Sequence, residues 1–313
     1  MPARSTEKTG TSSWAKGGAV LGAAAATALM GALTCWRARH VNPYRPVLER
    51  LQLLLPGRSE FLAGLRIGFI TDIHAGPFMG PADVERATDL LAAASPDVVL
   101  LGGDYVSESP RHLSRTIPLL GDLCRAVPLG GFAVLGNHDL FVSAPKVQAA
   151  LEQEGIRVLR NEAVAIQWNR GAVWIVGIDD SLHGRPDIDL AFASVPAGAP
   201  SIALWHEPEL AAQVAGRGSL VQLSGHTHGG QIQIPGLRPV WLPLHGRRHV
   251  IGLNVVDGMP VYTSRGAGVY RPPFRLNCPP EVTLITFMQS ASTAALKKWQ
   301  TDRANLQWEW FIR

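Results

Sequence analysis

Short apolar runs alternate with amphipathic stretches along most of this chain from Leu65 onward. The runs are bounded by glycine, proline or polar residues, which is typical of buried strands. Strands are expected at residues 65–71, 98–101, 131–135, 163–167, 173–178, 201–205, 220–224, 261–264 and 282–287. Apolar positions recur at helical spacing in 81–94, and helices are also expected at 113–126 and 145–154. Strands that alternate with helices predict an α/β core.

The segments before this core follow a different pattern. Residues 1–16 are polar, and residues 17–36 contain no charged side chain. A helix over 17–36 would be about 30 Å long, the thickness of a bilayer core, which predicts a transmembrane anchor. A cleaved signal peptide and a buried helix are the two alternatives. Lys and Arg occur on both sides of this segment, so they do not decide its orientation.

Proline and glycine breakers between 37 and 63 indicate a linker that ends in a lead-in strand. From residue 289 the chain becomes polar again before an aromatic end. The chain is therefore expected to comprise a polar tail (1–16), an anchor (17–36), a linker (37–63), one large domain (64–288) and a C-terminal tail (289–313).

Composition adds three constraints. Hydrophobic residues make up 46% of the chain and charged residues 17%, which argues against a disordered protein. The net charge of +4 and the pI near 9.2 fit an anionic partner, such as phosphate, a membrane surface or nucleic acid. The three cysteines, Cys35, Cys124 and Cys278, have no Cys-x-x-Cys spacing and indicate neither a disulfide framework nor a zinc knuckle.

Potential metal ligands follow five of the expected strands. In chain order they are Asp72 and His74, then Asp104, then Asn137 with His138 and Asp139, then His206, and last His226 and His228. In open α/β sheets, sites form where the carboxyl ends of strands meet. Glycines around His226 and His228 would let both imidazoles turn towards one place. Imidazoles on such a loop suit Mn, Fe or Zn.

This ordered set resembles the signature of the calcineurin-like metallophosphoesterases. The matching motifs are Asp72-x-His74, Gly103-Asp104, Gly136-Asn137-His138-Asp139, His206 and Gly225-His226-Thr227-His228, within roughly residues 65–287. Secondary motifs are similar to the bacterial membrane-attached branch: Pro43-Tyr44-Arg45, Gly229-Gly230-Gln231, Ser264-Arg265-Gly266 and Pro279-Pro280-Glu281.

The resemblance implies an α/β fold in which two mixed β-sheets are flanked by helices, a four-layer αββα sandwich. To this the expected anchor adds an N-terminal transmembrane helix. The protein would then be single-pass in the cytoplasmic membrane, and the branch favours a catalytic domain (64–288) on the outer face.

The resemblance also implies a centre of two divalent ions, Mn, Fe or Zn, bridged by Asp104. The first ion would take Asp72, His74 and His228, and the second Asn137, His206 and His226. His138 would assist the leaving group while Asp139 orients its ring. Arg265 would reach the phosphate, with a surface salt bridge as the equal alternative.

The expected function is hydrolysis of a phosphoester, with a phosphodiester favoured, by a hydroxide that bridges the two metal ions. A lipid-linked substrate is suggested by the anchor and by apolar and basic residues between 231 and 252, and no nucleic-acid partner is expected. One alternative is a pyrophosphate hydrolase of lipid A synthesis acting on a UDP-linked acylated sugar. Another is a metal-free scaffold that binds proteins. The oligomeric state stays open.

Overall fold

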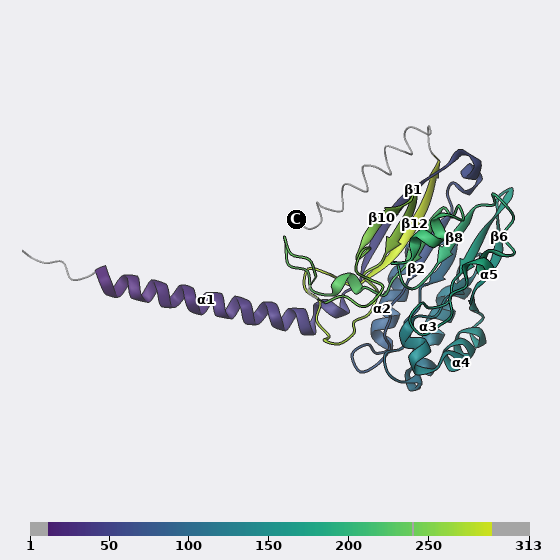
Figure 1. Ribbon diagram of the computed structural model, residues 1–313. Coiled ribbons are helices and arrows are strands. Elements are labelled where there is room, and N and C mark those ends of the chain that lie inside the picture. The colour runs from purple at the N-terminus through teal and green to yellow at the C-terminus, as the bar shows by residue number, and fades with distance from the viewer. Residues whose placement is uncertain (1–11, 240, 290–313) are drawn as a thin grey trace, which may run out of the picture.

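The computed structural model describes residues 12–239 and 241–289, with side chains of the first helix described from residue 23 (Figure 1). Residues 1–11 of the expected polar tail, and all of the expected C-terminal tail beyond residue 289, lie outside this part of the chain. The described residues form two six-stranded sheets and the helices that cover them.

The first sheet has the strand order β1-β12-β2-β3-β4-β5. Its strands are β1 (Val47–Leu55), β12 (Glu281–Gln289), β2 (Arg66–Ile70), β3 (Val98–Leu101), β4 (Gly131–Ala133) and β5 (Arg157–Val158). β12 is antiparallel to β2, and every other neighbouring pair in this sheet is parallel. The expected linker thus contributes β1, which pairs with β12 along its whole length.

The second sheet has the order β10-β11-β9-β8-β7-β6. Its strands are β10 (Gly252–Val256), β11 (Met259–Thr263), β9 (Val221–Ser224), β8 (Ser201–Leu204), β7 (Gly171–Gly177) and β6 (Glu162–Trp168). The two outer pairs, β10 with β11 and β6 with β7, are antiparallel, while the inner pairs are parallel. Both sheets are therefore mixed.

Three apolar clusters stack the elements into layers. One lies between the sheets and joins Leu100 of β3 to Ile202 of β8. A second cluster joins Leu101 of β3 to the helices on the outer face of the first sheet. A third cluster joins strands of the second sheet to the helices on the outer face of that sheet. The helices are α2 (Pro81–Ala92), α3 (Leu113–Arg125), α4 (Asn137–Gln153), α5 (Ile188–Phe192) and α6 (Ala211–Ala215), with short 3₁₀ turns at Asn42–Tyr44, Gly57–Leu62, Pro110–His112 and His228–Gly230. Burial on both faces explains why the central strands are apolar throughout.

The helix expected at 145–154 begins earlier, at Asn137. Its backbone is non-helical at Ser143, two residues before Pro145. Proline lacks a backbone donor and its ring clashes with the carbonyl four residues earlier, so the helix is interrupted in the turn before Pro145. The extra N-terminal turn carries Asn137 and His138.

Helix α1 (Ser12–His40) extends away from the two sheets (Figure 1). Its last turn meets the domain, where Ala38 is buried and its carbonyl accepts a hydrogen bond from the Arg275 amide at 2.8 Å. Among the described helices none combines the length and the apolar character that crossing a bilayer requires. Much of the apolar run is alanine and glycine, which add little transfer free energy. The prediction of a transmembrane helix at 17–36, and of a single-pass location in the cytoplasmic membrane, is therefore wrong.

Candidate metal centre

The side chains singled out in the sequence converge at the carboxyl ends of five strands. Asp72 and His74 follow β2, Asp104 follows β3, Asn137 follows β4, His206 follows β8, and His226 with His228 follows β9. The ends of β2, β3 and β4 in one sheet face those of β8 and β9 in the other. These residues other than Asn137, together with His138 and Glu207, form groups whose ligand atoms lie within 4.8 Å of one another: Asp72, His74 and His228; Asp72, Asp104 and His206; His74, Asp104 and His138; His206, Glu207 and His226.

The backbone at these positions is unusual. Asp72, His74, Asp104, His226 and His228 all have a positive φ, between 51° and 69°. Residues other than glycine rarely adopt this left-handed conformation, which costs on the order of 1 kcal/mol or more per residue, and such residues cluster at functional sites. The backbone conformation that turns these side chains inward therefore lowers the stability of the fold.

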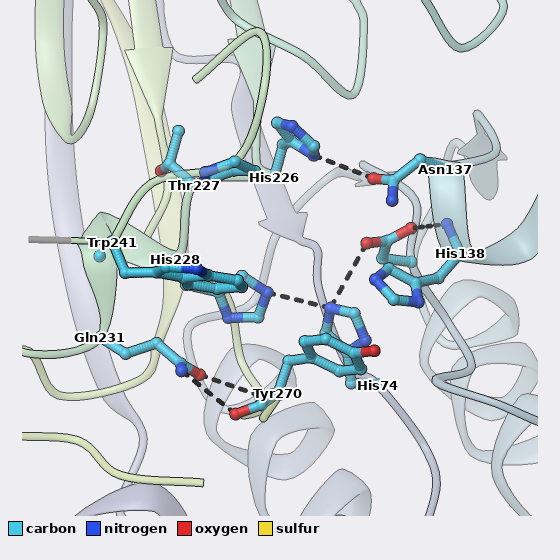
Figure 2. A pocket seen from close by; sticks show the side chains of 12 residues that line it. His74, Asn137, His138, His226, Thr227, His228, Gln231, Trp241 and Tyr270 are labelled. Carbon is cyan, nitrogen blue, oxygen red and sulfur yellow. Dashed lines mark hydrogen bonds and ion pairs between the residues drawn. The ribbon is translucent and has the colours of Figure 1, made fainter. Parts of the chain in front are cut away.

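One half of the centre contains His206 and His226. His206 Nδ1 donates to the Gly102 carbonyl at 2.7 Å, which leaves Nε2 at 3.3 Å from Asp104 Oδ2. His226 Nε2 donates to the Leu244 carbonyl at 2.7 Å, which leaves Nδ1 at 2.9 Å from Asn137 Oδ1 (Figure 2). A carbonyl thus fixes the tautomer of each ring and directs its lone pair into the centre.

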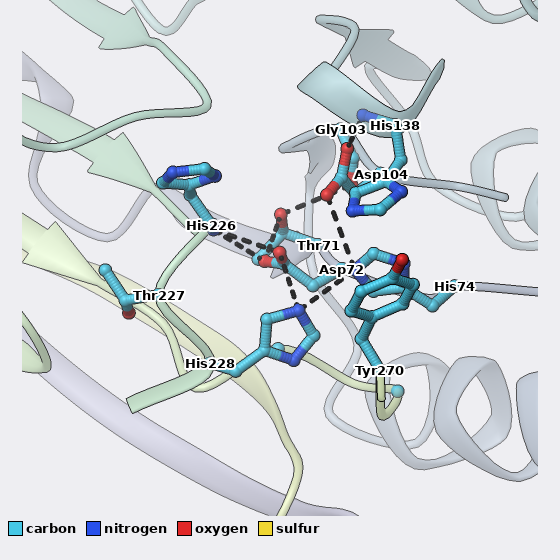
Figure 3. A network of polar contacts seen from close by, with 12 residues as sticks. Thr71, Asp72, His74, Gly103, Asp104, His138, His226, Thr227, His228 and Tyr270 are labelled. Atoms are coloured by element: carbon cyan, nitrogen blue, oxygen red, sulfur yellow. Dashed lines mark hydrogen bonds and ion pairs between the residues drawn. The ribbon is translucent and has the colours of Figure 1, made fainter. Parts of the chain in front are cut away.

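The other half contains His74, His228 and Asp72. The two Nε2 atoms of His74 and His228 are 2.9 Å apart, and His228 Nε2 is 3.3 Å from Asp72 Oδ1 (Figure 3). His74 Nε2 is 3.4 Å from Asp104 Oδ2, the same oxygen that faces His206. Asp104 Oδ2 therefore lies between the two halves.

These donors fit divalent metal ions. Imidazole nitrogens bind zinc-like ions at about 2.1 Å, so two ligand atoms at a right angle on one ion lie about 3 Å apart. Pairs of donors at 2.9–3.4 Å match that spacing. His206 Nε2 is buried and has no hydrogen-bond partner among the described residues. Four imidazoles with carboxylate and amide oxygens suit Mn, Fe or Zn better than Ca.

The pKa values of two ligand rings, His226 and His74, favour the neutral form that binds a metal ion. Burial lowers the pKa of His226 to about 4 and holds the pKa of His74 well below its usual value, so both rings are neutral at pH 7. Burial alone would raise the pKa of Asp104, but the rings of His206 and His138 outweigh it and hold that pKa well below its usual range. Asp104 is therefore an anion in the middle of the centre.

Comparison with known proteins identifies the family. Residues 65–230 match the family model described as calcineurin-like phosphoesterase. The chain belongs to the calcineurin-like phosphoesterase family. It is 33% identical to Phosphodiesterase YaeI of Escherichia coli (strain K12), over 71% of this chain and 82% of that protein. It is 30% identical to the uncharacterized metallophosphoesterase YkuE of Bacillus subtilis (strain 168), over 71% and 79% of the two chains.

A third relative of this phosphoesterase is an uncharacterized metallophosphoesterase of Aquifex aeolicus (strain VF5). It is 33% identical over 71% of this chain and 84% of its own. The family establishes the chain as a metallophosphoesterase, a hydrolase that uses divalent metal ions.

In this phosphoesterase Asp139 does not contact the ring of His138. Its carboxylate accepts the backbone amides of Asp104 (2.7 Å), Tyr105 (2.9 Å), Val106 (3.3 Å) and Gly136 (2.9 Å). His138 Nδ1 instead lies 3.0 Å from the Ser107 carbonyl. The carboxylate at the third position of α4 thus turns back to the free amides at the helix start and at the Asp104 loop, and the expected role of Asp139 on the His138 ring stays a prediction.

Arg265 is also placed differently from the expectation. Its guanidinium pairs with Glu49 and Glu281, and the residue is 8% exposed. It is absent from the described lining of the pocket, which is formed by His74, Asp104, Asn137, His138, His226, Thr227, His228, Gly230, Gln231, Trp241, Pro243 and Tyr270 (Figure 2). These ion pairs match the alternative of a salt bridge, except that this salt bridge is largely buried. A role of Arg265 on the phosphate stays a prediction.

The sequence did not single out Tyr270, Arg275 or Glu207. Tyr270 lines the pocket, and its ring centroid is 4.5 Å from that of His138. Arg275 is fully buried, with Nη2 at 3.3 Å from His228 Nδ1. Glu207 is buried beside His206, and burial raises its pKa well above the usual value. Glu207 could have been noticed as the neighbour of His206, and Tyr270 as an aromatic residue in a glycine-rich loop after an expected strand.

Proposed function

We propose that this metallophosphoesterase is a phosphodiesterase that holds two divalent ions, Mn, Fe or Zn, in its catalytic domain, residues 64–288. The observation that carries the proposal is the shared position of Asp104 Oδ2, 3.4 Å from His74 Nε2 and 3.3 Å from His206 Nε2. A carboxylate between two sets of donors is what a pair of closely spaced ions requires. The relative from Escherichia coli that carries the name phosphodiesterase adds support.

In this proposal the first ion is held by Asp72, His74 and His228, and the second by Asn137, His206 and His226, with Asp104 common to both. When bound, two such ions make water nucleophilic at neutral pH and neutralise charge on the phosphoryl group. The left-handed backbone and the carbonyls of Gly102 and Leu244 keep the donor atoms directed inward before any ion arrives.

His138 is proposed to serve the leaving group. Its amide donates to Asp104 Oδ1 at 2.8 Å, and its Nδ1 faces the Ser107 carbonyl at 3.0 Å. This leaves Nε2 as the ring atom that can give a proton to the leaving oxygen of a substrate in the pocket.

Metal content and hydrolysis test the function together. The full chain should contain about two ions per molecule, as the two-ion site requires, and should hydrolyse bis(4-nitrophenyl) phosphate faster than 4-nitrophenyl phosphate. Chelation should abolish hydrolysis and added Mn should restore it. Asp104→Asn should lower both readings, while Asp122→Asn, a change on an exposed carboxylate of α3, should alter neither. A folded protein with no metal and no hydrolysis after Mn addition would favour a metal-free scaffold.

A substrate with an apolar group next to its phosphate is the second candidate. Large apolar side chains are exposed in the segment that leads from the pocket: Ile232, Ile234, Leu237, Trp241 and Leu244. Trp241 also lines the pocket, so an acyl chain attached to a bound phosphodiester would lie on this segment.

Trp241→Ser combined with Leu237→Ser tests this candidate. Hydrolysis of an acylated phosphodiester should fall, while hydrolysis of bis(4-nitrophenyl) phosphate should be retained. An equal loss on both substrates would end the apolar-substrate idea. A UDP-linked acylated sugar is the third substrate to assay, because cleavage of its pyrophosphate would reassign the enzyme as a pyrophosphate hydrolase.

A further inference from the structure

The ring of His138 is held by neighbours other than Asp139. The Ser107 carbonyl is 3.0 Å from Nδ1. The His74 ring packs edge-on, with centroids 4.8 Å apart and an interplanar angle of 80°. The Tyr270 ring lies at 4.5 Å with an angle of 58°. The Ser107 contact comes from the backbone, and His74 belongs to the proposed ligand set. Tyr270 is therefore the neighbour among these three whose side chain has no role in the proposed mechanism so far.

Tyr270 is itself fixed by Gln231. The Gln231 side chain accepts the Tyr270 amide at 2.9 Å and donates to the carbonyls of Tyr270 at 3.1 Å and Pro272 at 3.2 Å. Gln231 is 4% exposed and directly follows the loop that carries His226 and His228. Figure 2 shows the contacts between Gln231 and Tyr270, and the Tyr270 ring alongside His74 and His138. Gln231 thus links the backbone of Tyr270, which lines the pocket, to the loop that carries His226 and His228.

We propose that Tyr270 is a positioning residue that holds the His138 ring towards the leaving group, and that Gln231 keeps Tyr270 in place. The proposal rests on the proposed function, in which His138 Nε2 donates a proton to the leaving oxygen. Without the Tyr270 ring, one face of the imidazole loses its packing and the ring can rotate away from the Ser107 carbonyl. A displaced donor is a poor catalyst even when it is present.

Leaving-group dependence tests the proposal, because a good leaving group needs little proton donation and a poor one needs more. Two diesters that differ in this respect are methyl 4-nitrophenyl phosphate and methyl phenyl phosphate. Tyr270→Ala should lower kcat on the phenyl ester on the order of tenfold and on the nitrophenyl ester far less. Tyr270→Phe, which keeps the ring, should recover most of the lost turnover. Phe141→Ala, an exposed aromatic residue on α4, should affect neither ester.

A second variant reaches Tyr270 indirectly. Gln231 has φ 58°, a conformation that asparagine tolerates, but the shorter asparagine side chain cannot span to the Tyr270 backbone. Gln231→Asn should therefore give the same selective loss on the phenyl ester. Metal content of every variant should equal that of the wild type, which separates positioning of His138 from damage to the ligand loop.

The double variant His138→Ala with Tyr270→Ala completes the test. Tyr270→Ala should add no further loss once His138 is absent. An equal loss on both esters, a loss of metal in Tyr270→Ala, or additive losses in the double variant would each overturn the positioning role. If His138→Ala itself loses the same factor on both esters, or the wild type cleaves neither, the proposed function fails, and the positioning role fails with it.

Discussion

His138 and Asp139 are neighbours in the chain, but their side chains serve different partners. His138 lies in the pocket next to the proposed ligands and also within a group of possible donors with His74 and Asp104. If it serves the leaving group, His138→Ala should keep both ions and lower turnover by about 10²-fold. Metal analysis beside kcat on methyl phenyl phosphate, whose poor leaving group needs the proton, checks this. A fall in metal content would make His138 a ligand instead.

Asp139 organises backbone, and its replacement should act through stability. Asp139→Asn puts an amide donor where a carboxylate oxygen accepts the amides of Asp104, Tyr105, Val106 or Gly136. A buried amide left without an acceptor costs about 1–3 kcal/mol, so we expect a loss on the order of 2 kcal/mol in unfolding free energy.

Metal affinity should fall with stability in Asp139→Asn, because the Asp104 loop loses its anchor. Denaturant unfolding and metal titration measure the two effects. A variant with wild-type stability and metal affinity but low turnover would instead support the expectation that Asp139 orients His138.

At the scale of single residues, the sequence predicted which side chains would meet. Each motif contains a potential ligand directly after an expected strand, and the ends of those strands lie together. It did not predict what Asp139, Arg265 and Tyr270 contact. Those contacts depend on the side-chain direction at a helix start, or on a distant strand such as β1 with its Glu49. Neither the side-chain direction nor the position of the distant strand can be read from the spacing of residues within a motif.

At the scale of elements, each ligand loop follows a short buried strand and packs against another loop. Gly225 directly follows β9, and a methyl group at its Cα would lie 2.0 Å from Asp72 Oδ2 and 2.4 Å from Thr71 Oγ1. Both neighbours are buried at the end of β2 and cannot move aside. The glycine is therefore required for contact between the two sheets at the centre.

Gly225→Ala should displace Asp72 and lower metal content and thermal stability together. Overpacking of a buried site typically costs about 1–3 kcal/mol. Gly216→Ala is the matched control, since no atom lies within 4 Å of the added methyl group. Calorimetry and metal analysis of both variants make the comparison. Wild-type metal content in Gly225→Ala would mean that the loops have more freedom than these contacts imply.

The strand pattern predicted an α/β core because two-sided burial leaves a clear apolar signal, as in 98–101, whereas the two mixed sheets were implied by the family resemblance. The start of α4 was missed because Pro145 hides a helix that continues through a kink at Ser143. The transmembrane prediction failed because an uncharged run of sufficient length is not apolar enough to cross a bilayer when many of its side chains are alanine and glycine.

At the scale of the whole molecule, Arg275 joins the end of α1 to the metal centre. Its backbone amide donates to the Ala38 carbonyl at 2.8 Å, and its carbonyl accepts from Asn42 Nδ2 at 2.9 Å. Its buried guanidinium donates to the carbonyls of Arg265 at 2.7 Å and Cys278 at 3.3 Å, and to both Gly266 and Gly268, next to the His228 ring. Burial lowers the pKa of this guanidinium. One side chain thus satisfies the backbone of the loop behind the first proposed ion.

Arg275→Met should leave these carbonyls buried without a donor. Each unpaired group costs about 1–3 kcal/mol, so we expect a loss on the order of 3 kcal/mol even though a buried charge is removed. Metal affinity should fall as well, because His228 belongs to the loop that Arg275 supports. Arg157→Met is the control, since an exposed ion pair contributes little. Urea unfolding and metal titration measure the two effects. If Arg275→Met matches Arg157→Met in both measurements, the hydrogen bonds from Arg275 to these carbonyls do not support the metal centre. Arg275 would then not connect the end of α1 to that centre.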